Sequence, residues 1–342
     1  MSEISIRIEG QAGRITLQRP KALNAVTYAM CTAIEQALDQ WRDNDTVKLI
    51  ILDAEGDKAF SAGGDIADLY RTGTAGDFAY GQQFWRDEYR MNAKIHEYPK
   101  PIVSFLQGFT MGGGMGVGCH GSHRIVGETS QIAMPECGIG LVPDVGGSLI
   151  LANAPGHLGA YAGTTGARMN ADDAILVGFA DMFIPQDLWP GLTATLIETG
   201  DPACLTAASA PAPQGPMRAA RREIDRHFAA RTLPALLASL RADDSEFADK
   251  ALASVLRSAP LSVAYTLDMM HSLRGQTDIR AALDLEYRFT FRAMEHGDFL
   301  EGIRAAIIDK DRSPRWKHDA DALPDSAVQT MLAPLGDNAL NF

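Results

Sequence analysis

Residues 101–114 read PIVSFLQGFTMGGG and place an apolar segment directly before a glycine-rich loop. The segment Pro101–Leu106 predicts a strand covered on both faces, because a short apolar run bounded by turn residues is typical of a buried strand. The same order occurs earlier, where Lys48–Leu52 (KLIIL) precedes the glycine-rich residues Lys58–Asp65 (KAFSAGGD). Glycines in such loops let backbone N–H groups approach a ligand closely. Two loops of this kind fit either an oxyanion hole with two N–H donors or tight turns that pack helices on a sheet.

The segments around these loops predict a mixed α/β fold. Residues Ile4–Ile8 and Arg14–Leu17 alternate apolar and polar side chains across a glycine-containing turn, which indicates a β-hairpin. From Val26 to Trp41 the apolar residues recur at helical spacing, and Arg124–Val126 and Gln131–Ala133 are shorter candidate strands. Strands that alternate with helices favour an α/β fold with parallel pairing.

The last third of the chain has a different pattern. Residues 201–216 (DPACLTAASAPAPQGP) are rich in alanine and proline and predict a linker or an exposed loop. Beyond it, Met217–His271 and Ile279–Ile308 have the apolar spacing of helices. We therefore expect an α/β core over residues 1–200 and a helical C-terminal section over residues 201–342.

Composition and charge limit the possible partners. The chain has 342 residues, of which 46% are hydrophobic, and a formal net charge of −12, so it can bury a sizeable core. The negative charge disfavours nucleic acid or an anionic membrane surface as the main partner, and an anionic ligand needs a local positive or N–H-rich site. The N-terminus lacks the pattern of a secretory signal and no segment has the length of a membrane-spanning helix, so we expect a cytoplasmic protein.

Several catalytic motifs are excluded by their spacing. The residues Gly116, Gly118 and Gly121 satisfy GxGxxG, but they do not directly follow a strand as a dinucleotide-binding fingerprint requires. The chain contains neither a P-loop motif nor a GxSxG elbow. The four cysteines are scattered and form no CxxC pair, so no metal site is predicted, and Cys137 is expected to be a buried core thiol rather than a nucleophile.

Two carboxylates stand out in the segment Met134–Gly147, MPECGIGLVPDVGG. From Thr129 to Gly156, Glu136 and Asp144 are the only charged side chains. An ionised carboxylate is costly to desolvate unless it is paired, hydrogen-bonded or neutralised. These two acids are therefore candidates for chemistry, although each could also cap a helix or a turn.

Taken together, these motifs resemble the enoyl-CoA hydratase/isomerase (crotonase) superfamily. The resemblance rests on Pro101–Gly147, on KAFSAGGDI at 58–66 and on LQRPKALNAV at 17–26. It implies a crotonase-like core of repeated ββα units that binds acyl-CoA thioesters, with coenzyme A as part of the substrate and no separate cofactor. It also implies assembly into homo-oligomers, as trimers or hexamers.

The resemblance assigns roles to individual residues. The two N–H groups of the oxyanion hole fall on Ala62 and Gly113. The reactive carboxylate falls on Glu136, as a general base or as a nucleophile. The residues that contact coenzyme A fall on two short segments: Lys21, Ala22, Leu23, Ala62, Asp65 and Ile66.

The placement of the acids resembles one branch of this superfamily, the 3-hydroxyisobutyryl-CoA hydrolases. Hydratases carry a glutamate at the position that is Gly116 here and a glycine at the position of Asp144. The segment FWRDEY at 84–89 resembles one in which a glutamate lies near the substrate, which places Glu88 there. The C-terminal run Leu285–Trp316 also resembles the ending of the hydrolase branch. The resemblance thus implies hydrolysis of 3-hydroxyisobutyryl-CoA in valine catabolism, with Glu88, Gly113, Glu136 and Asp144 at the acyl group.

Two alternatives remain open at this stage. Enoyl- or dienoyl-CoA hydratases and isomerases belong to the same superfamily, and dienoyl-CoA isomerases also have a glutamate and an aspartate eight residues apart. They carry a third acid near position 116 and lack this C-terminal ending. A catalytically silent acyl-CoA-binding protein is the alternative from another class, but it has no need of two desolvated acids.

Overall fold

The computed structural model describes residues 3–342, which group into two compact units. Unit 1 comprises Met1–Asp65, Asp87–Ala133 and Arg168–Gly215. Unit 2 comprises Ile66–Arg86, Met134–Ala167 and Pro216–Phe342. The fold of each unit is described separately below.

Unit 1 is built on a six-stranded sheet with the strand order β1-β2-β3-β5-β7-β9. The first two strands form the predicted antiparallel hairpin, and the others pair in parallel. Their bounds are β1 Ile4–Glu9, β2 Ala12–Leu17, β3 Leu49–Ala54, β5 Ile102–Phe105, β7 His123–Val126 and β9 Met182–Phe183. The predicted strands of this sheet are thus confirmed, and only the two-residue β9 was not predicted.

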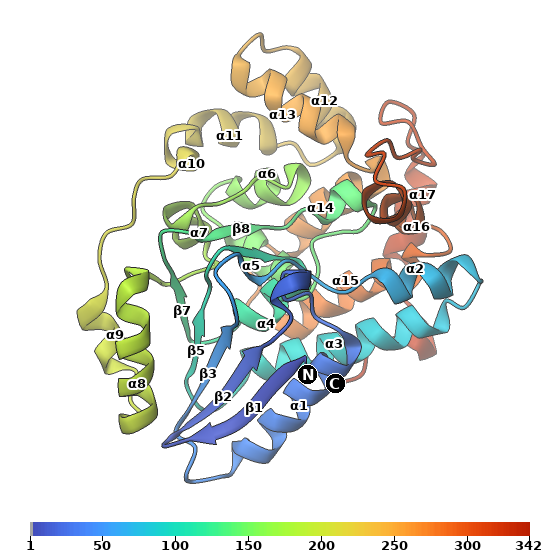
Figure 1. Ribbon diagram of the computed structural model, residues 1–342. Helices are drawn as coiled ribbons and strands as arrows, with labels where there is room; N and C mark the ends of the chain where they lie inside the picture. The colour runs from blue at the N-terminus through green and yellow to red at the C-terminus, as the bar shows by residue number, and fades with distance from the viewer. Residues whose placement is uncertain (1–2) are drawn as a thin grey trace. The chain divides into compact units, whose positions relative to one another are not determined.

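Helices cover both faces of the large sheet. Helix α1 (Tyr28–Arg42) begins where the Thr27 side chain accepts a hydrogen bond from the Met30 N–H, and it buries the predicted apolar stripe that ends at Trp41. Helices α8 (Trp189–Thr199) and α9 (Ala203–Ala208) lie along the other side (Figure 1). The strands and these two helices share one apolar cluster, formed by Ala12, Leu49, Ile51, Val103, Phe105, Ile125, Ile184, Trp189, Leu196 and Leu205.

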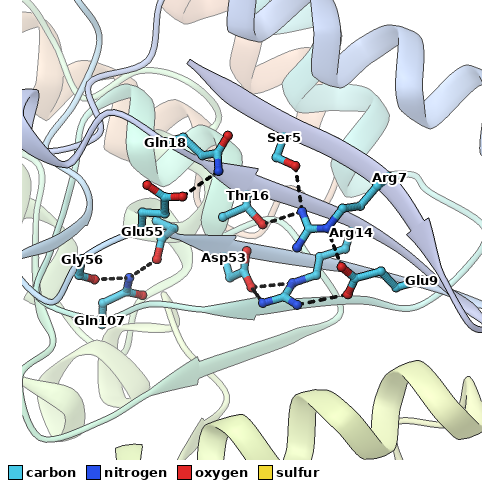
Figure 2. Close-up of polar contacts among 11 residues, drawn as sticks. Ser5, Arg7, Glu9, Arg14, Thr16, Gln18, Asp53, Glu55, Gly56 and Gln107 are labelled. Atoms are coloured by element: carbon cyan, nitrogen blue, oxygen red, sulfur yellow. Dashed lines mark hydrogen bonds and ion pairs between the residues drawn. The ribbon is translucent and has the colours of Figure 1, made fainter. Parts of the chain in front are cut away.

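Charged side chains cross three neighbouring strands of the large sheet (Figure 2). The Arg14 guanidinium on β2 donates to Asp53 Oδ2 on β3 at 2.8 Å and to Glu9 Oε2 on β1 at 3.1 Å. Arg7 donates to Thr16 Oγ1 at 3.0 Å. Partly exposed ion pairs of this kind contribute little stability, about 1 kcal/mol or less each. Their role is to favour one pairing register of these strands.

A second, smaller sheet carries the glycine-rich loops. Its strands are β4 (Ala59–Ser61), β6 (Phe109–Met111) and β8 (Gln131–Ala133), which pair in parallel in that order. The chain therefore repeats a ββα pattern, in which β3 and β4 precede α2 (Ala67–Thr74), and β5 and β6 precede α4 (Gly113–Gly118). This repeat confirms the expected α/β fold with ββα units.

Unit 2 is built almost entirely from helices. The helix α14 is apolar on most of its surface and packs against α5, α6, α12, α13 and α17. The helices of this unit after residue 133 are α5 Gly147–Asn153, α6 Leu158–Thr165, α10 Pro216–Ala219, α11 Arg221–Phe228, α12 Leu233–Arg241, α13 Glu246–Arg257, α14 Pro260–Leu273, α15 Ile279–Ala293, α16 Phe299–Ile303 and α17 Asp325–Leu332. A π-helical turn, Arg304–Ile308, follows α16.

The two units do not follow the single boundary at residues 200 and 201 that the sequence predicts. Residues 134–167 belong to unit 2 because α5 and α6 pack against α14. The predicted linker at 201–216 is in part a helix, α9, in which Leu205 is fully buried against the large sheet. A boundary drawn from composition misses both features, since it does not show which helices share a core. No helix within residues 3–342 is long and apolar enough to span a membrane.

Candidate active site

The two glycine-rich loops leave neighbouring strands of the small sheet. Strand β4 ends at Ser61 and strand β6 ends at Met111, and the two strands run in parallel. The Phe60 N–H donates to Gln107 O at 2.7 Å, and the Phe109 N–H donates to Lys58 O at 3.0 Å. The carboxyl ends of adjacent parallel strands lie at the same edge of a sheet, so residues 62–64 and 112–114 emerge side by side.

The side chain of Gln107 fixes the base of these loops. Its Nε2 donates to Ala54 O at 2.9 Å and to Gly56 O at 3.0 Å (Figure 2). The next loop turns at Gly112, whose φ of 48° and ψ of −127° lie in a region open only to glycine. Glycine at 112 therefore determines how the second loop leaves its strand, while Gln107 joins the β5–β6 connection to the β3–β4 connection.

The prediction that Ala62 supplies an oxyanion-hole donor is corrected by its hydrogen bonding. The Ala62 N–H donates to Leu23 O at 2.9 Å and is not available to a ligand. The nitrogen of Gly64, two residues later, lies 3.1 Å from the position that a Cβ on Gly113 would occupy. Within residues 3–342, no acceptor is found for the N–H groups of Gly64 and Gly113. The pair of adjacent donors is therefore Gly64 and Gly113.

Glu88 lies beside this pair of donors in unit 1. Its side chain projects from α3 (Ala79–His96) and is 3% exposed, although the surrounding charged segment favours a solvated face. The Glu88 Oε1 atom lies 3.0 Å from the position of a Cβ on Gly113. Its negative charge, after burial itself, raises the pKa of the Cys31 thiol. A buried acid thus stands next to the candidate donors.

The segments predicted to contact coenzyme A are partly brought together. The Val26 N–H donates to Gly63 O at 2.9 Å and the Asp65 N–H to Val26 O at 2.8 Å, which joins residues 19–26 to residues 62–65. Arg19 forms an ion pair with Asp65 at 2.9 Å. Lys21 and Ala22 are exposed in a short 3₁₀ turn that ends at Leu23. Ile66 begins α2 and belongs to unit 2.

Glu136 is a buried acid at the start of a 3₁₀ turn, Glu136–Ile139, in unit 2. It is 4% exposed, and in the part of the chain that the structure describes no donor reaches its Oε2 atom. Burial, followed by the negative charge of Asp144 and a smaller contribution from Glu286, raises the pKa of Glu136 well above its ordinary value. A carboxyl group in this state is suited to hold and release a proton.

Asp144 lies in the loop between this turn and α5. It is also 4% exposed, and its carbonyl oxygen accepts a hydrogen bond from the Gly147 N–H at 2.8 Å. The next residue, Val145, has a φ of 53°, which is a strained conformation for a β-branched side chain. Such strain costs about 1–3 kcal/mol and persists only where surrounding contacts impose it. The backbone that carries Asp144 is therefore held in place by its surroundings.

A third acid of unit 2, Glu286, was not predicted from the sequence. It is fully buried on α15, and its carboxyl group accepts hydrogen bonds from the Gly146 N–H at 2.8 Å and the Ser148 N–H at 3.2 Å. Burial, followed by the charge of Asp144, raises the pKa of Glu286 to about 8. Its helical spacing was the available signal, because Leu283, Glu286 and Tyr287 lie on one buried face.

The predicted role of Cys137 as a core thiol agrees with its surroundings in unit 2. It is 1% exposed, and its Sγ lies 3.4 Å from Thr266 Oγ1. Burial raises the pKa of this thiol to about 12, which opposes formation of a nucleophilic thiolate.

The candidate residues of the two units thus differ in the kind of polar group that they provide. Unit 1 offers two adjacent backbone donors, which stabilise negative charge that develops on an oxygen atom. Unit 2 offers buried carboxyl groups whose pKa values are raised, which suits proton transfer or nucleophilic attack.

Comparison with known proteins gives a consistent family, whose similar members are named for different activities. A family model described as "Enoyl-CoA hydratase/isomerase" matches residues 12–332. A protein of Rattus norvegicus named "3-hydroxyisobutyryl-CoA hydrolase, mitochondrial" is 37% identical, and the match covers 100% of this chain and 91% of the relative. A Gallus gallus protein of the same name is 35% identical over the same shares.

Two solved structures match over nearly their full length. One is described as an enoyl-CoA hydratase from Rhodobacter sphaeroides, with 56% identity, a TM-score of 0.95 and coverage of 100% of both chains. The other is described as a carnitinyl-CoA dehydratase from Mycobacterium thermoresistibile, with 37% identity, a TM-score of 0.95 and coverage of 100% of this chain and 99% of the other.

Proposed function

The chain belongs to the enoyl-CoA hydratase/isomerase family, the crotonase family of acyl-CoA enzymes, and we propose that it hydrolyses the thioester of 3-hydroxyisobutyryl-CoA. The observation that carries this proposal is the pair of buried acids Glu136 and Asp144 in unit 2, where the charge of one raises the pKa of the other. The position at which hydratases carry a second glutamate is Gly116, which has no side chain to act on a double bond. The names of the 35–37% identical relatives support the same reaction.

In the proposed reaction, negative charge develops on the thioester oxygen as its carbonyl carbon is attacked. The N–H groups of Gly64 and Gly113 donate to that oxygen, and each such donor contributes about 3 kcal/mol to the transition state. Glycine at both positions leaves room for the thioester, since a Cβ at Gly113 would lie only 3.0 Å from Glu88 Oε1.

Glu136 supplies the reactive carboxylate by one of two balanced routes. As a general base it takes a proton from water, the water oxygen bonds to the carbonyl carbon, and the C–S bond breaks as the proton passes to the thiolate of coenzyme A. As a nucleophile its oxygen bonds to the carbonyl carbon and displaces the thiolate, and water then cleaves the resulting anhydride. Both routes yield a free carboxylate and free coenzyme A.

Asp144 is assigned to the substrate's 3-hydroxyl group. A hydroxyl group that donates to Asp144 compensates the desolvation of that carboxylate. The charge of Asp144 also keeps the proton on Glu136 until the acyl group is bound, because two neighbouring carboxylates separate their pKa values.

Hydration of an enoyl-CoA is the second candidate, and one observation favours it. The 56% identical structure is described as an enoyl-CoA hydratase. A panel of 3-hydroxyisobutyryl-CoA, 3-hydroxypropionyl-CoA and a short 2-enoyl-CoA separates the two activities. Hydrolysis predicts free thiol from the first substrate above all. If no thiol is released while the enoyl absorbance falls, the second candidate is correct.

A further inference from the structure

Glu286 anchors the loop that carries Asp144. Its carboxyl group accepts hydrogen bonds from the Gly146 N–H and the Ser148 N–H, and the Ser148 hydroxyl is a third partner. These contacts fix residues on both sides of Gly147, only two to four positions beyond Asp144. They also restrain the strained Val145, so the geometry around Asp144 depends on Glu286.

The contacts of Glu286 are compatible with either of its charge states. As a carboxylate it accepts from all three groups. When it carries a proton on Oε1, that proton can be donated to Ser148 Oγ, because a hydroxyl group both donates and accepts. Oε2 still accepts from Gly146, so the loop keeps its anchor in both states.

The groups that influence Glu286 in unit 2 are almost all acidic. The charges of Asp144 and Glu136 interact with Glu286 from the loop that follows residue 135. Tyr265 on α14 also interacts with it electrostatically, and the Tyr265 hydroxyl group donates to Leu285 O at 2.6 Å. Helix α5 has no titratable side chain. Helix α17 has only Asp325, which is exposed. Full ionisation of Glu286 therefore adds a negative charge to a site that already holds two acids.

We propose that Glu286 is a positioning residue for the reaction, which keeps the Asp144–Ser148 loop hydrogen-bonded through Gly146 and Ser148 in either of its own charge states. This inference rests on the proposed function for the step that it serves. Its proton equilibrium, in contrast, is a property of the resting protein and can be measured without a substrate.

The first test is a carboxyl-carbon NMR titration of the full chain with isotope-labelled glutamate. Glu286→Gln identifies the Glu286 signal by its loss. In the wild-type protein we expect the signal to titrate near pH 8, and in Asp144→Asn to titrate at clearly lower pH because a neighbouring charge is gone. A midpoint near the ordinary value of 4.5 that Asp144→Asn leaves unchanged would overturn the inference.

The second test is the pH profile of thioester hydrolysis by Glu286→Gln. Glutamine keeps two of the three contacts, because its amide donates to Ser148 Oγ and its oxygen accepts from Gly146, and it loses only the acceptor for the Ser148 N–H at 3.2 Å. In the wild type, ionisation of Glu286 adds a negative charge beside Asp144 and Glu136 and should lower turnover as the pH rises through about 8. In Glu286→Gln we expect this alkaline step to disappear, while turnover at neutral pH stays within about threefold of the wild type.

A purely structural role for Glu286 predicts a uniform loss of turnover with an unchanged profile, which would contradict the inference. If no thioester is hydrolysed at all, the proposed function fails, and the NMR titration still decides the role of Glu286.

Discussion

The glycine-rich loops of unit 1 provide polar groups from the backbone, whereas the acid cluster of unit 2 (Glu136, Asp144 and Glu286) provides them from buried side chains. The loops place the N–H groups of Gly64 and Gly113 next to each other, and these backbone donors do not themselves titrate, although the Glu88 carboxyl group lies beside them. The cluster buries Glu136, Asp144 and Glu286, and the charge of Asp144 raises the pKa values of the other two. The access of a ligand to the backbone donors thus depends on glycines that have no side chain. The pKa values of Glu136 and Glu286 depend instead on the charges of neighbouring residues.

The largest expected effect comes from removing the reactive carboxylate of the cluster. Glu136→Gln should lower turnover by about 10³-fold, because an amide neither accepts a proton nor attacks a thioester at a useful rate. Binding of a non-hydrolysable CoA thioether should persist, as measured by calorimetry.

The matched control for this variant is Glu246→Gln, which changes an exposed glutamate paired with Lys250 in the same unit. It should leave turnover unchanged. Near-normal turnover of Glu136→Gln would remove Glu136 from the chemistry.

The next effect tests the loops of unit 1. Gly113→Ala should lower kcat/KM by about 10²-fold, because the new methyl group crowds the Gly64 nitrogen and Glu88, and one donor is lost to the substrate. Gly191→Ala is the control, since a Cβ there meets nothing within 4 Å and alanine favours the helix α8. Equal kinetics of the two variants would show that the Gly113 N–H does not act.

A smaller effect is expected when an acid of the cluster loses its charge but keeps a polar side chain. Asp144→Asn removes the charge that raises the pKa of Glu136, so the acidic limb of the turnover profile should move to lower pH. KM for 3-hydroxyisobutyryl-CoA should rise as the 3-hydroxyl loses its charged acceptor. The control Asp325→Asn, at an exposed site, should change neither. An acidic limb that stays in place would mean that the charge of Asp144 does not act on Glu136.

Glu286→Gln has the smallest expected effect on turnover at neutral pH, but it should change how stability depends on pH. The folded protein holds a proton on Glu286 at pH values where the unfolded chain has lost it, so this contribution is complete below pH 4.5 and disappears as pH rises through about 8. Each unit of pKa shift corresponds to about 1.4 kcal/mol. Glu286→Gln should therefore show a flatter decline of Tm between pH 5 and pH 8 than the wild type. Parallel curves for the two proteins would show that Glu286 does not hold this proton.

Much of the fold could be predicted because its signals are local. The apolar runs at 48–52 and 101–106 predicted β3 and β5, and alternation predicted the hairpin of β1 and β2. Strands β4, β6 and β9 were missed, because two or three residues are too few to show a period. The grouping into units was also missed, since it depends on packing between segments far apart in the chain.

The motifs of the candidate site could be predicted from the sequence, but the particular backbone amide and the third buried acid could not. The donor was predicted at Ala62, and Gly64 was not considered, because which amide of residues 62–64 is engaged depends on Leu23 O, an acceptor 39 residues away from Ala62. Glu286 was not predicted because it is one of many charged residues in a helical segment, and only its place among the buried apolar residues of α15 distinguishes it. In both cases contacts between segments far apart in the chain decide which polar group is hydrogen-bonded, and a short stretch of sequence does not show these contacts.

The most direct measurement is the fate of 3-hydroxyisobutyryl-CoA in water enriched in the heavy oxygen isotope. Mass spectrometry of the products shows where the labelled oxygen enters. We predict free coenzyme A and 3-hydroxyisobutyrate with the label in its carboxylate. Intact thioester that carries the label in its hydroxyl group, through reversible dehydration, would contradict hydrolysis and identify the protein as a hydratase.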